Sequence, residues 1–414
     1  MKVRDLNIKD YTYVLPPERI AQQPLAERDA SLLLIYRDGQ LSHNVFRNLP
    51  DVLPAGSLLV FNDTKVIHAR LLGRTPTGAQ IEIFLLQPVA PYTDLQLAMF
   101  QHGSALWRCM VGNARRWRTG TLQISFQNNK TSGVLHLSRK GRLNGDYLVE
   151  LQWTPADLSL SSVLEAVGHV PLPPYIKRSD QPVDRERYQS IFGHRDGSVA
   201  SPTASLHFTE RVMEQLKKNQ IRSLFLTLHI SAGTFLPVKS ERLGDHRMHQ
   251  EQVCVHRYFI EHMLQWLQGT SNPRPPLISV GTTSMRSLES LYWLGCRLLR
   301  GLPQEVAQWD PYDLDDSPTV HEALWALLRH MQQEEKNQLV FSTALLIAPG
   351  YRFKLVDALI TNFHLPQSTL LLLVAAFVGD DWKRIYEYAL AHDFRFLSYG
   401  DTSLLFAPRT SKSD

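Results

Sequence analysis

The stretch Leu277-Ile-Ser-Val-Gly-Thr-Thr-Ser284 decides the fold that we expect for this chain of 414 residues. Its first four residues predict a short buried strand, the glycine predicts a tight turn, and the hydroxyl residues predict the start of a helix. The same alternation continues on both sides of this stretch, which predicts an α/β architecture. The further elements that we expect are helices at Thr209–Lys218, from Ser368 and at Trp382–His392, and strands at Ile221–Ile230, Ala344–Ile347 and Leu355–Ile360.

Residues 81–150 have a different texture. Short runs of alternating apolar and polar residues are separated by Gly, Asn and charged turns, which predicts a small all-β module, either a barrel or a sandwich. A proline-rich joint, Pro171–Tyr175, follows it. We therefore expect a small β-barrel domain over residues 76–154, inserted into a larger α/β domain made of residues 1–75 and 155–414. The acidic stretch 299–338 shows no matching strands and is expected to be a peripheral elaboration.

The composition is that of an ordinary globular protein. Hydrophobic residues make up 43% and charged residues 20% of the chain, which argues against disordered, collagen-like and coiled-coil classes. Cys109, Cys254 and Cys296 are widely spaced, so neither a disulfide framework nor a structural zinc site is expected. No signal segment is apparent, and the longest apolar run is about half of the ~20 residues that a membrane span needs. We expect a cytoplasmic protein without a membrane segment.

Charge is unevenly distributed along the chain. The 44 Lys and Arg residues barely outnumber the 40 Asp and Glu residues, but no acidic residue lies between Gln101 and Arg142. This basic window, which also contains Trp107 and Trp117, falls in the expected β domain. It is typical of a surface that contacts a nucleic-acid backbone and stacks on unpaired bases; the alternative is a solvated basic face. The candidate contact residues are Arg108, Arg115, Arg116, Arg118, Lys130 and Lys140.

Polar side chains follow several expected strands, where α/β proteins place their binding sites. Asp63 and Lys65 come directly after the apolar strand Leu58–Phe61. The small-residue block 199–209, which contains Thr203 and His207, leads into a helix and allows a ligand to approach the backbone. These positions are candidates for binding a polar ligand.

Two further histidine groups lie between the strands of the expected α/β domain. His229 is near the tip of a strand, and His246 and His249 lie close to Glu251. No HExxH or comparable spacing is present, so we expect no metal. General acid–base catalysis or ligand hydrogen bonding is the better interpretation.

The opening stretch itself places Thr282 and Thr283 at a helix N-terminus, which can hold an anion or a carboxylate. An ordinary helix cap would explain these hydroxyls but not Arg286 and Glu289 together. The stretch has neither the P-loop nor the dinucleotide-binding pattern. Residues 349–366 add a carboxylate within an apolar strand and polar residues at its end, so the candidates there are Tyr351, Arg352, Asp357, Asn362 and His364.

Six blocks, in order over nearly the whole chain, carry a family resemblance: Ile20-Ala-Gln-Gln-Pro-Leu-Ala-Glu-Arg-Asp29, Phe61-Asn-Asp-Thr-Lys-Val-Ile-His-Ala-Arg70, Pro202-Thr-Ala-Ser-Leu-His-Phe-Thr209, Val280-Gly-Thr-Thr-Ser284, Thr361-Asn-Phe-His-Leu-Pro-Gln-Ser-Thr369 and Ser398-Tyr-Gly-Asp401. They resemble the S-adenosylmethionine:tRNA ribosyltransferase-isomerase family, which makes epoxyqueuosine in tRNA. The resemblance implies a large α/β-barrel-like domain with an inserted small β-barrel.

The resemblance also implies the reaction and its partners. S-adenosylmethionine is a consumed ribosyl donor rather than a cofactor, the acceptor is 7-aminomethyl-7-deazaguanine at the wobble position of the tRNA anticodon stem-loop, and adenine and methionine leave. The sulfonium acidifies the ribose 5′ carbon, so a base must remove a proton there and a second group must assist adenine. We expect a monomer rather than an obligate oligomer.

Residue types that suit these demands are present. His207, His229, His249 and His364 are the candidate acid–base residues. Asp63 and Asp357 could bind the deazaguanine edge or orient an imidazole. Arg70, Arg286 and Arg352 could hold phosphate or the methionine carboxylate. The remaining candidate substrate-binding residues are Lys65, Thr203, Thr282, Thr283, Glu289, Tyr351 and Asn362.

Two alternatives remain open from the sequence. Ser201, Ser205 and Ser231 stand where the family usually has smaller residues, which narrows the approach of a ligand to the backbone. A divergent transferase with another acceptor, or a non-catalytic tRNA-binding paralogue, would explain these differences.

Overall fold

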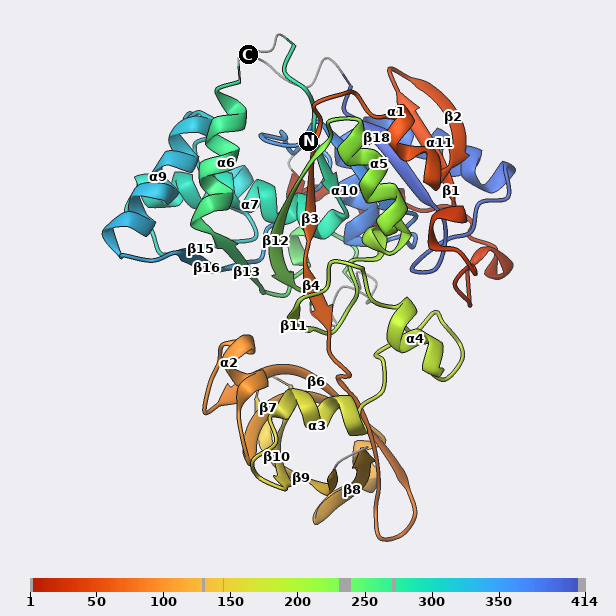
Figure 1. Ribbon diagram of the computed structural model, residues 1–414, viewed down its shortest axis with the longest axis vertical. Coiled ribbons are helices and arrows are strands. Elements are labelled where there is room, and N and C mark those ends of the chain that lie inside the picture. The colour runs from red at the N-terminus through yellow and green to blue at the C-terminus, as the bar shows by residue number, and fades with distance from the viewer. Residues whose placement is uncertain (1–2, 129–130, 144, 231–239, 270–272, 409–414) are drawn as a thin grey trace.

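A computed structural model describes residues 3–128, 131–143, 145–230, 240–269 and 273–408. It consists of a large α/β domain and a small closed barrel that lies beyond one end of the large sheet (Figure 1). The predicted α/β class with an inserted all-β barrel is confirmed. Among the described residues, no helix has both the length and the apolar character needed to cross a membrane.

Ten strands of the described chain form one mixed sheet, in the order β15-β16-β13-β12-β3-β14-β17-β18-β1-β2. The two outer strands, β15 and β2, do not pair with each other in the described chain, so the large sheet is open. The bounds are β1 Leu32–Arg37, β2 Gln40–Val45, β3 Leu58–Asn62, β12 Arg222–His229, β13 Glu251–His256, β14 Leu277–Val280, β15 Glu305–Val306, β16 Gln338–Thr343, β17 Ala358–Asn362 and β18 Thr402–Phe406.

The centre of this sheet is parallel. Strands β12, β3, β14 and β17 are parallel neighbours, and every residue of β3, β14 and β17 is buried. Their continuous apolar runs are typical of strands that are covered on both faces. In β3, Leu58 and Val60 face one apolar core, while Leu59 and Phe61 face another.

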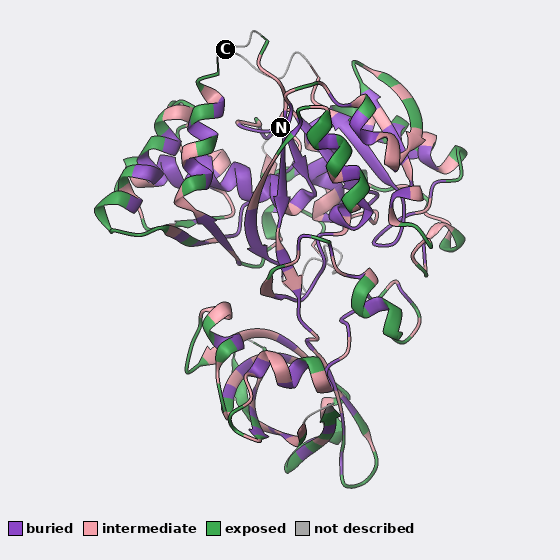
Figure 2. Ribbon diagram, in the orientation of Figure 1, coloured by how far each residue is buried: buried purple, intermediate pink, exposed green. Residues whose placement is uncertain are grey.

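Helices cover both faces of the sheet, and Figure 2 shows their outer sides exposed and the strands between them buried. The helix that starts in the opening stretch, α7 (Thr282–Leu299), is buried along most of its length. Ser368 caps α10 as predicted, because its Oγ accepts the N–H of Leu371 at 3.2 Å. The other helices are α1 Leu49–Val52, α2 Leu95–Phe100, α3 Leu160–Val167, α4 Pro182–Arg187, α5 Glu210–Lys218, α6 Arg257–Leu267, α8 Asp310–Asp313, α9 Val320–Gln333, α10 Thr369–Val378 and α11 Trp382–Ala391.

The small domain is a closed barrel with strand order β10-β7-β6-β5-β8-β9. It begins at Arg70, before the expected start at residue 76, because Leu71 of its first strand already belongs to the barrel core. Trp107 and Trp117 are buried in that core, so the prediction that they stack on unpaired bases is wrong. The strands are β5 Arg70–Arg74, β6 Gln80–Ala90, β7 Ser104–Gly112, β8 Thr121–Asn128, β9 Thr131–Leu143 and β10 Asp146–Thr154.

The acidic stretch 299–338 is part of the large domain rather than a peripheral elaboration. Its strand β15 pairs with β16, and Leu324 and Leu327 of α9 pack in the main core. Asp310 is buried and pairs with Arg297 at 3.0 Å. The strand expected at Ala344–Ile347 is also wrong: β16 ends at Thr343, and the apolar residues after it are buried in a loop.

Candidate functional site

A cleft opens where the carboxyl ends of β12, β14 and β17 meet. Its walls come from residues 200–204, 281–283 and 361–365, together with Ile230 at the end of β12. This is the edge at which parallel α/β sheets bind their ligands. Gly281 has a φ of +92°, which a residue with a side chain rarely adopts, and this turn brings the start of α7 to the cleft.

Two hydroxyl groups that line this cleft lack hydrogen-bond partners among the described residues. They are Ser201 Oγ on one wall and Thr283 Oγ1 at the start of α7, both shielded from solvent. Buried hydroxyl groups are normally hydrogen-bonded, so unpartnered ones beside a cleft indicate a place for a polar ligand. The free N–H groups of the α7 N-terminus favour a negatively charged group there. The predicted Thr203, Thr282 and Thr283 all line the cleft.

Arg286 lies one turn further along α7, against a smaller cavity that shares Thr282 and Thr283 with the cleft. It is buried and forms an ion pair with Glu251 of β13. Burial lowers the pKa of Arg286 to about 10, so the guanidinium stays charged at neutral pH. Its charge is balanced within the protein, and its predicted role in binding an anion stays a prediction.

His364 is the histidine that lines the cleft, among the residues that the structure describes. Its Nε2 lies 2.9 Å from Thr361 Oγ1, and its backbone N–H donates to the hydroxyl of Tyr386 at 3.1 Å. Burial lowers its pKa to about 3. The imidazole is therefore neutral near pH 7, which is the form that can accept a proton.

His207 lies behind the cleft and is tied at both ring nitrogens. Its Nε2 is 3.0 Å from Asn362 Oδ1, and its Nδ1 is 2.7 Å from Ser31 Oγ. Because an amide oxygen only accepts, the proton sits on Nε2 and Nδ1 accepts from Ser31. Burial lowers the pKa of His207 to about 4. Its contacts orient Asn362, which lines the cleft and also donates to the carbonyl of Leu397 at 3.0 Å.

His229 and Asp63 lie at neighbouring strand ends, as predicted, but outside the cleft walls. His229 Nδ1 is 3.0 Å from Thr64 Oγ1, and burial lowers its pKa to about 4. Asp63 accepts from Thr227 Oγ1 at 2.6 Å, and burial raises its pKa. Both residues hold the end of the sheet where the chain leaves for the barrel.

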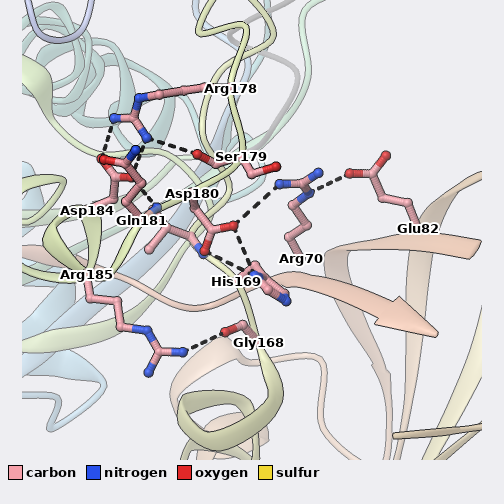
Figure 3. Close-up of polar contacts among 11 residues, drawn as sticks. Arg70, Glu82, Gly168, His169, Arg178, Ser179, Asp180, Gln181, Asp184 and Arg185 are labelled. Carbon is pink, nitrogen blue, oxygen red and sulfur yellow. Dashed lines mark hydrogen bonds and ion pairs between the residues drawn. The ribbon is translucent and has the colours of Figure 1, made fainter. Parts of the chain in front are cut away.

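Lys65 and Arg70 contact carboxylates at the joint between the two domains. Lys65 Nζ lies 3.1 Å from Asp196 and 3.4 Å from Glu165. Arg70 lies between Glu82 and Asp180, as Figure 3 shows. Neither residue lines the cleft.

Glu289 and Tyr351 stabilise the loop that leads into β17. The buried carboxylate of Glu289 accepts from Tyr351 Oη at 2.8 Å and from backbone N–H groups of residues 354–356. The sequence does not show that backbone N–H groups surround the Glu289 carboxylate. In the structure Glu289 and Tyr351 contact each other and this loop, and neither lines the cleft. Arg352 is exposed on the same loop.

Asp357 and His249 also lie away from the cleft. Asp357 precedes β17, at the opposite end of that strand from Asn362, and accepts the backbone N–H of Leu277 at 2.8 Å. The sequence analysis expected Asp357 inside a strand and therefore did not distinguish the two ends of β17. His249 is exposed, in the irregular segment before β13.

The predicted RNA-contacting residues divide into two groups on the barrel. Arg115, Arg116 and Arg118 are exposed beside the short turn that follows β7. Arg108 pairs with Asp146 at 3.1 Å and Lys140 pairs with Glu150 at 2.9 Å, so their charges are partly balanced. Lys130 lies outside the described residues.

Several cleft residues were not predicted from the sequence, and two of them contact each other through their hydroxyl groups. Tyr175 and Ser398 both line the cleft, and their hydroxyl oxygens are 2.7 Å apart. Tyr175 ends the proline-rich joint and Ser398 begins one of the six sequence blocks. Ser398 could have been predicted from that block. Tyr175 could not, because the sequence does not show that the proline-rich joint passes the cleft.

Comparison with known proteins supplies the family. Residues 8–405 match the family described as "Queuosine biosynthesis protein". The chain belongs to this family. It is 37% identical over 402 residues to the S-adenosylmethionine:tRNA ribosyltransferase-isomerase of Aromatoleum aromaticum, covering 97% of both chains. The enzyme of the same name from Aquifex aeolicus is 36% identical over 403 residues, covering 97% of this chain and 100% of the relative.

A solved structure is also similar to the chain. It is the crystal structure of S-adenosylmethionine tRNA ribosyltransferase from Thermotoga maritima, 28% identical, with a TM-score of 0.45 and coverage of 96% of this chain and 100% of that one. The predicted resemblance to the ribosyltransferase-isomerase family is thus confirmed by relatives that span nearly the whole chain.

Proposed function

We propose that this protein is an S-adenosylmethionine:tRNA ribosyltransferase-isomerase of queuosine biosynthesis. It consumes S-adenosylmethionine, transfers and isomerises the ribosyl group onto 7-aminomethyl-7-deazaguanine at the tRNA wobble position, and releases adenine and methionine. The observation that carries the proposal is the meeting of three family blocks, at residues 202–204, 281–283 and 361–365, in one cleft at the carboxyl ends of the sheet. Relatives with this activity in their names match 97% of the chain.

His364 is the group in the cleft that suits the first proton transfer. The Thr361 hydroxyl lies 3.3 Å from the carbonyl of Asn362 and can donate to it. In that arrangement, the Nε2–H of His364 donates to Thr361 Oγ1, and Nδ1 keeps a lone pair. A neutral imidazole with a free lone pair is a general base, and removal of the acidified 5′ proton of the ribose requires one.

The start of α7 suits the methionine carboxylate. A carboxylate there would receive backbone N–H groups and the unpartnered Thr283 hydroxyl. Ser201, which also lines the cleft, offers a further hydroxyl to the ribose or the base. Asn362, held by His207, presents an oriented amide beside them.

The barrel suits the tRNA. Arg115, Arg116 and Arg118 are exposed, and no ion pair holds them within the described chain. Cations of this kind bind phosphate groups without reading sequence. The barrel would therefore hold the anticodon stem-loop by its backbone while the wobble base enters the cleft.

A product assay tests this function. The protein is incubated with S-adenosylmethionine and tRNA that carries the aminomethyl base, and adenine and the mass of the modified base are measured. The proposal predicts adenine together with a heavier tRNA base. tRNA binding without adenine would indicate a non-catalytic paralogue, and adenine with a different acceptor would indicate a divergent transferase.

A further inference from the structure

The chain passes between the large domain and the barrel at two neighbouring points. The chain enters the barrel at Arg70 and returns at His169, and these residues pair through their backbones: the N–H of His169 donates to Arg70 O at 2.8 Å, and the N–H of Arg70 to His169 O at 3.4 Å. The barrel and the large domain have separate apolar cores, but Val199, which follows strand β11 (Arg195–Ser198), packs in the core of the barrel. Next to these crossings, helix α2 contacts β11, and Ser161 of α3 donates to Asp196 at 3.0 Å. Domains joined mainly by polar contacts can move relative to one another.

One carboxylate, Asp180, contacts the chain both where it enters the barrel and where it returns. Its side chain is 8% exposed and accepts from His169 Nδ1 at 3.0 Å and from the backbone N–H of Val170 at 3.3 Å. Arg70 Nη1 lies 3.7 Å from Asp180, while Arg70 Nε donates to Glu82 of β6 at 2.5 Å. Figure 3 shows Arg70 between the barrel carboxylate and the Asp180 carboxylate.

The segment that carries Asp180 is anchored to the cleft. Asp184, at the first turn of α4, is fully buried and receives two hydrogen bonds from Arg178, at 2.7 and 2.8 Å. It also accepts from Tyr399 Oη at 2.7 Å, and Tyr399 directly follows the cleft residue Ser398. Asp180 therefore belongs to the same packed unit as the cleft wall, while Arg70 and Glu82 belong to the barrel.

We propose that Asp180 is a positioning residue that fixes the orientation of the barrel relative to the cleft. Its charge holds Arg70, and its oxygens accept from His169 and Val170 where the chain returns, so loss of the charge weakens the contacts at both crossings. Because the barrel carries the exposed arginines, its orientation sets where a bound tRNA presents its base. This last step rests on the proposed function; the orientation itself does not.

The orientation is tested by a distance measurement. The three native cysteines are buried, so spin labels are attached to cysteines introduced as Thr119→Cys on the barrel and Lys218→Cys on α5, which are both exposed positions. Asp180→Asn should broaden the distance distribution between the labels. The matched control is Glu186→Gln, an exposed carboxylate on α4, which should leave the distribution narrow. An unchanged distribution in Asp180→Asn would overturn the proposal.

The consequence for tRNA is tested by steady-state kinetics on the same variants without labels. Asp180→Asn should raise the KM for tRNA about tenfold, equivalent to about 1.4 kcal/mol, and leave the KM for S-adenosylmethionine unchanged. Asp180→Glu, which keeps the charge, should recover part of the loss. A broadened distance distribution with an unchanged KM for tRNA would overturn the positioning role. A wild-type protein that does not turn over substrate would refute the proposed function instead, and the distance distributions would still test whether Asp180 fixes the orientation of the barrel.

Discussion

Glu289 allows a direct test of whether a buried charged residue stabilises the fold or binds the substrate. Its carboxylate accepts the backbone N–H groups of Lys354 at 2.9 Å, Leu355 at 3.0 Å and Val356 at 3.2 Å, and the Tyr351 hydroxyl at 2.8 Å. The change Glu289→Ala leaves these three N–H groups, two of them buried and one partly buried, without a partner. We expect it to lower the free energy of unfolding and not to act through ligand binding.

The size of the effect follows from those contacts. A buried donor without a partner costs about 1–3 kcal/mol, so three donors cost about 3 kcal/mol or more. That is a large part of the about 5–15 kcal/mol that stabilises a typical protein. Urea unfolding followed by circular dichroism measures it, with Glu214→Ala on the exposed side of α5 as the control. If Glu289→Ala unfolded within about 0.5 kcal/mol of wild type yet no longer bound S-adenosylmethionine, the structural assignment would be refuted.

Three further outcomes are expected. Burial holds the pKa of His207 and His229 at about 4, below the unfolded value of about 6.5. The stability that these two residues contribute is therefore complete above pH 6.5 and is lost as the pH falls toward about 4. Urea unfolding should show a lower free energy of unfolding at pH 5 than at pH 7, and Thr64→Val, which leaves both imidazoles buried, should show the same difference. Arg115→Ala with Arg116→Ala should weaken tRNA binding and flatten its dependence on salt by about 1.4–1.8 units of slope. Lys140→Ala should change the slope less, because Lys140 is already paired with Glu150. Gly295→Ala should destabilise the protein by about 1–3 kcal/mol or more, since the added Cβ would lie 2.3 Å from the carbonyl of Ala323 on α9; unaltered thermal unfolding would mean that residues 299–338 are peripheral after all.

The sequence predicted those parts of the fold that are determined locally. Strand β14 and the start of α7 were evident because an apolar run, a glycine and hydroxyl residues follow one another within the opening stretch. The start of the barrel was missed because β5 is defined by its pairing with β6, which no local pattern reveals. The role of α9 was missed for the same reason: its apolar residues can be read from the sequence, but their contact with α7 cannot.

The site was predictable to the extent that it lies at strand ends. Thr283, Asn362 and His364 follow predicted strands, and all three line the cleft. Asp357 was expected inside a strand, but β17 begins one residue later, at Ala358, so Asp357 lies at the end of β17 that is far from the cleft. Arg70 was taken for a ligand-binding residue because a sequence identifies a charge but not the carboxylate that it meets.

The rate of adenine release by His364→Ala is the most direct test of the central claim that S-adenosylmethionine reacts in the cleft at the ends of β12, β14 and β17. Wild type, His364→Ala and the exposed His249→Ala are compared with saturating S-adenosylmethionine and tRNA, after circular dichroism has shown that each is folded. The loss of a general base predicts a fall of about 10²–10⁴ for His364→Ala, with His249→Ala unchanged. Wild-type adenine release by His364→Ala would contradict the claim.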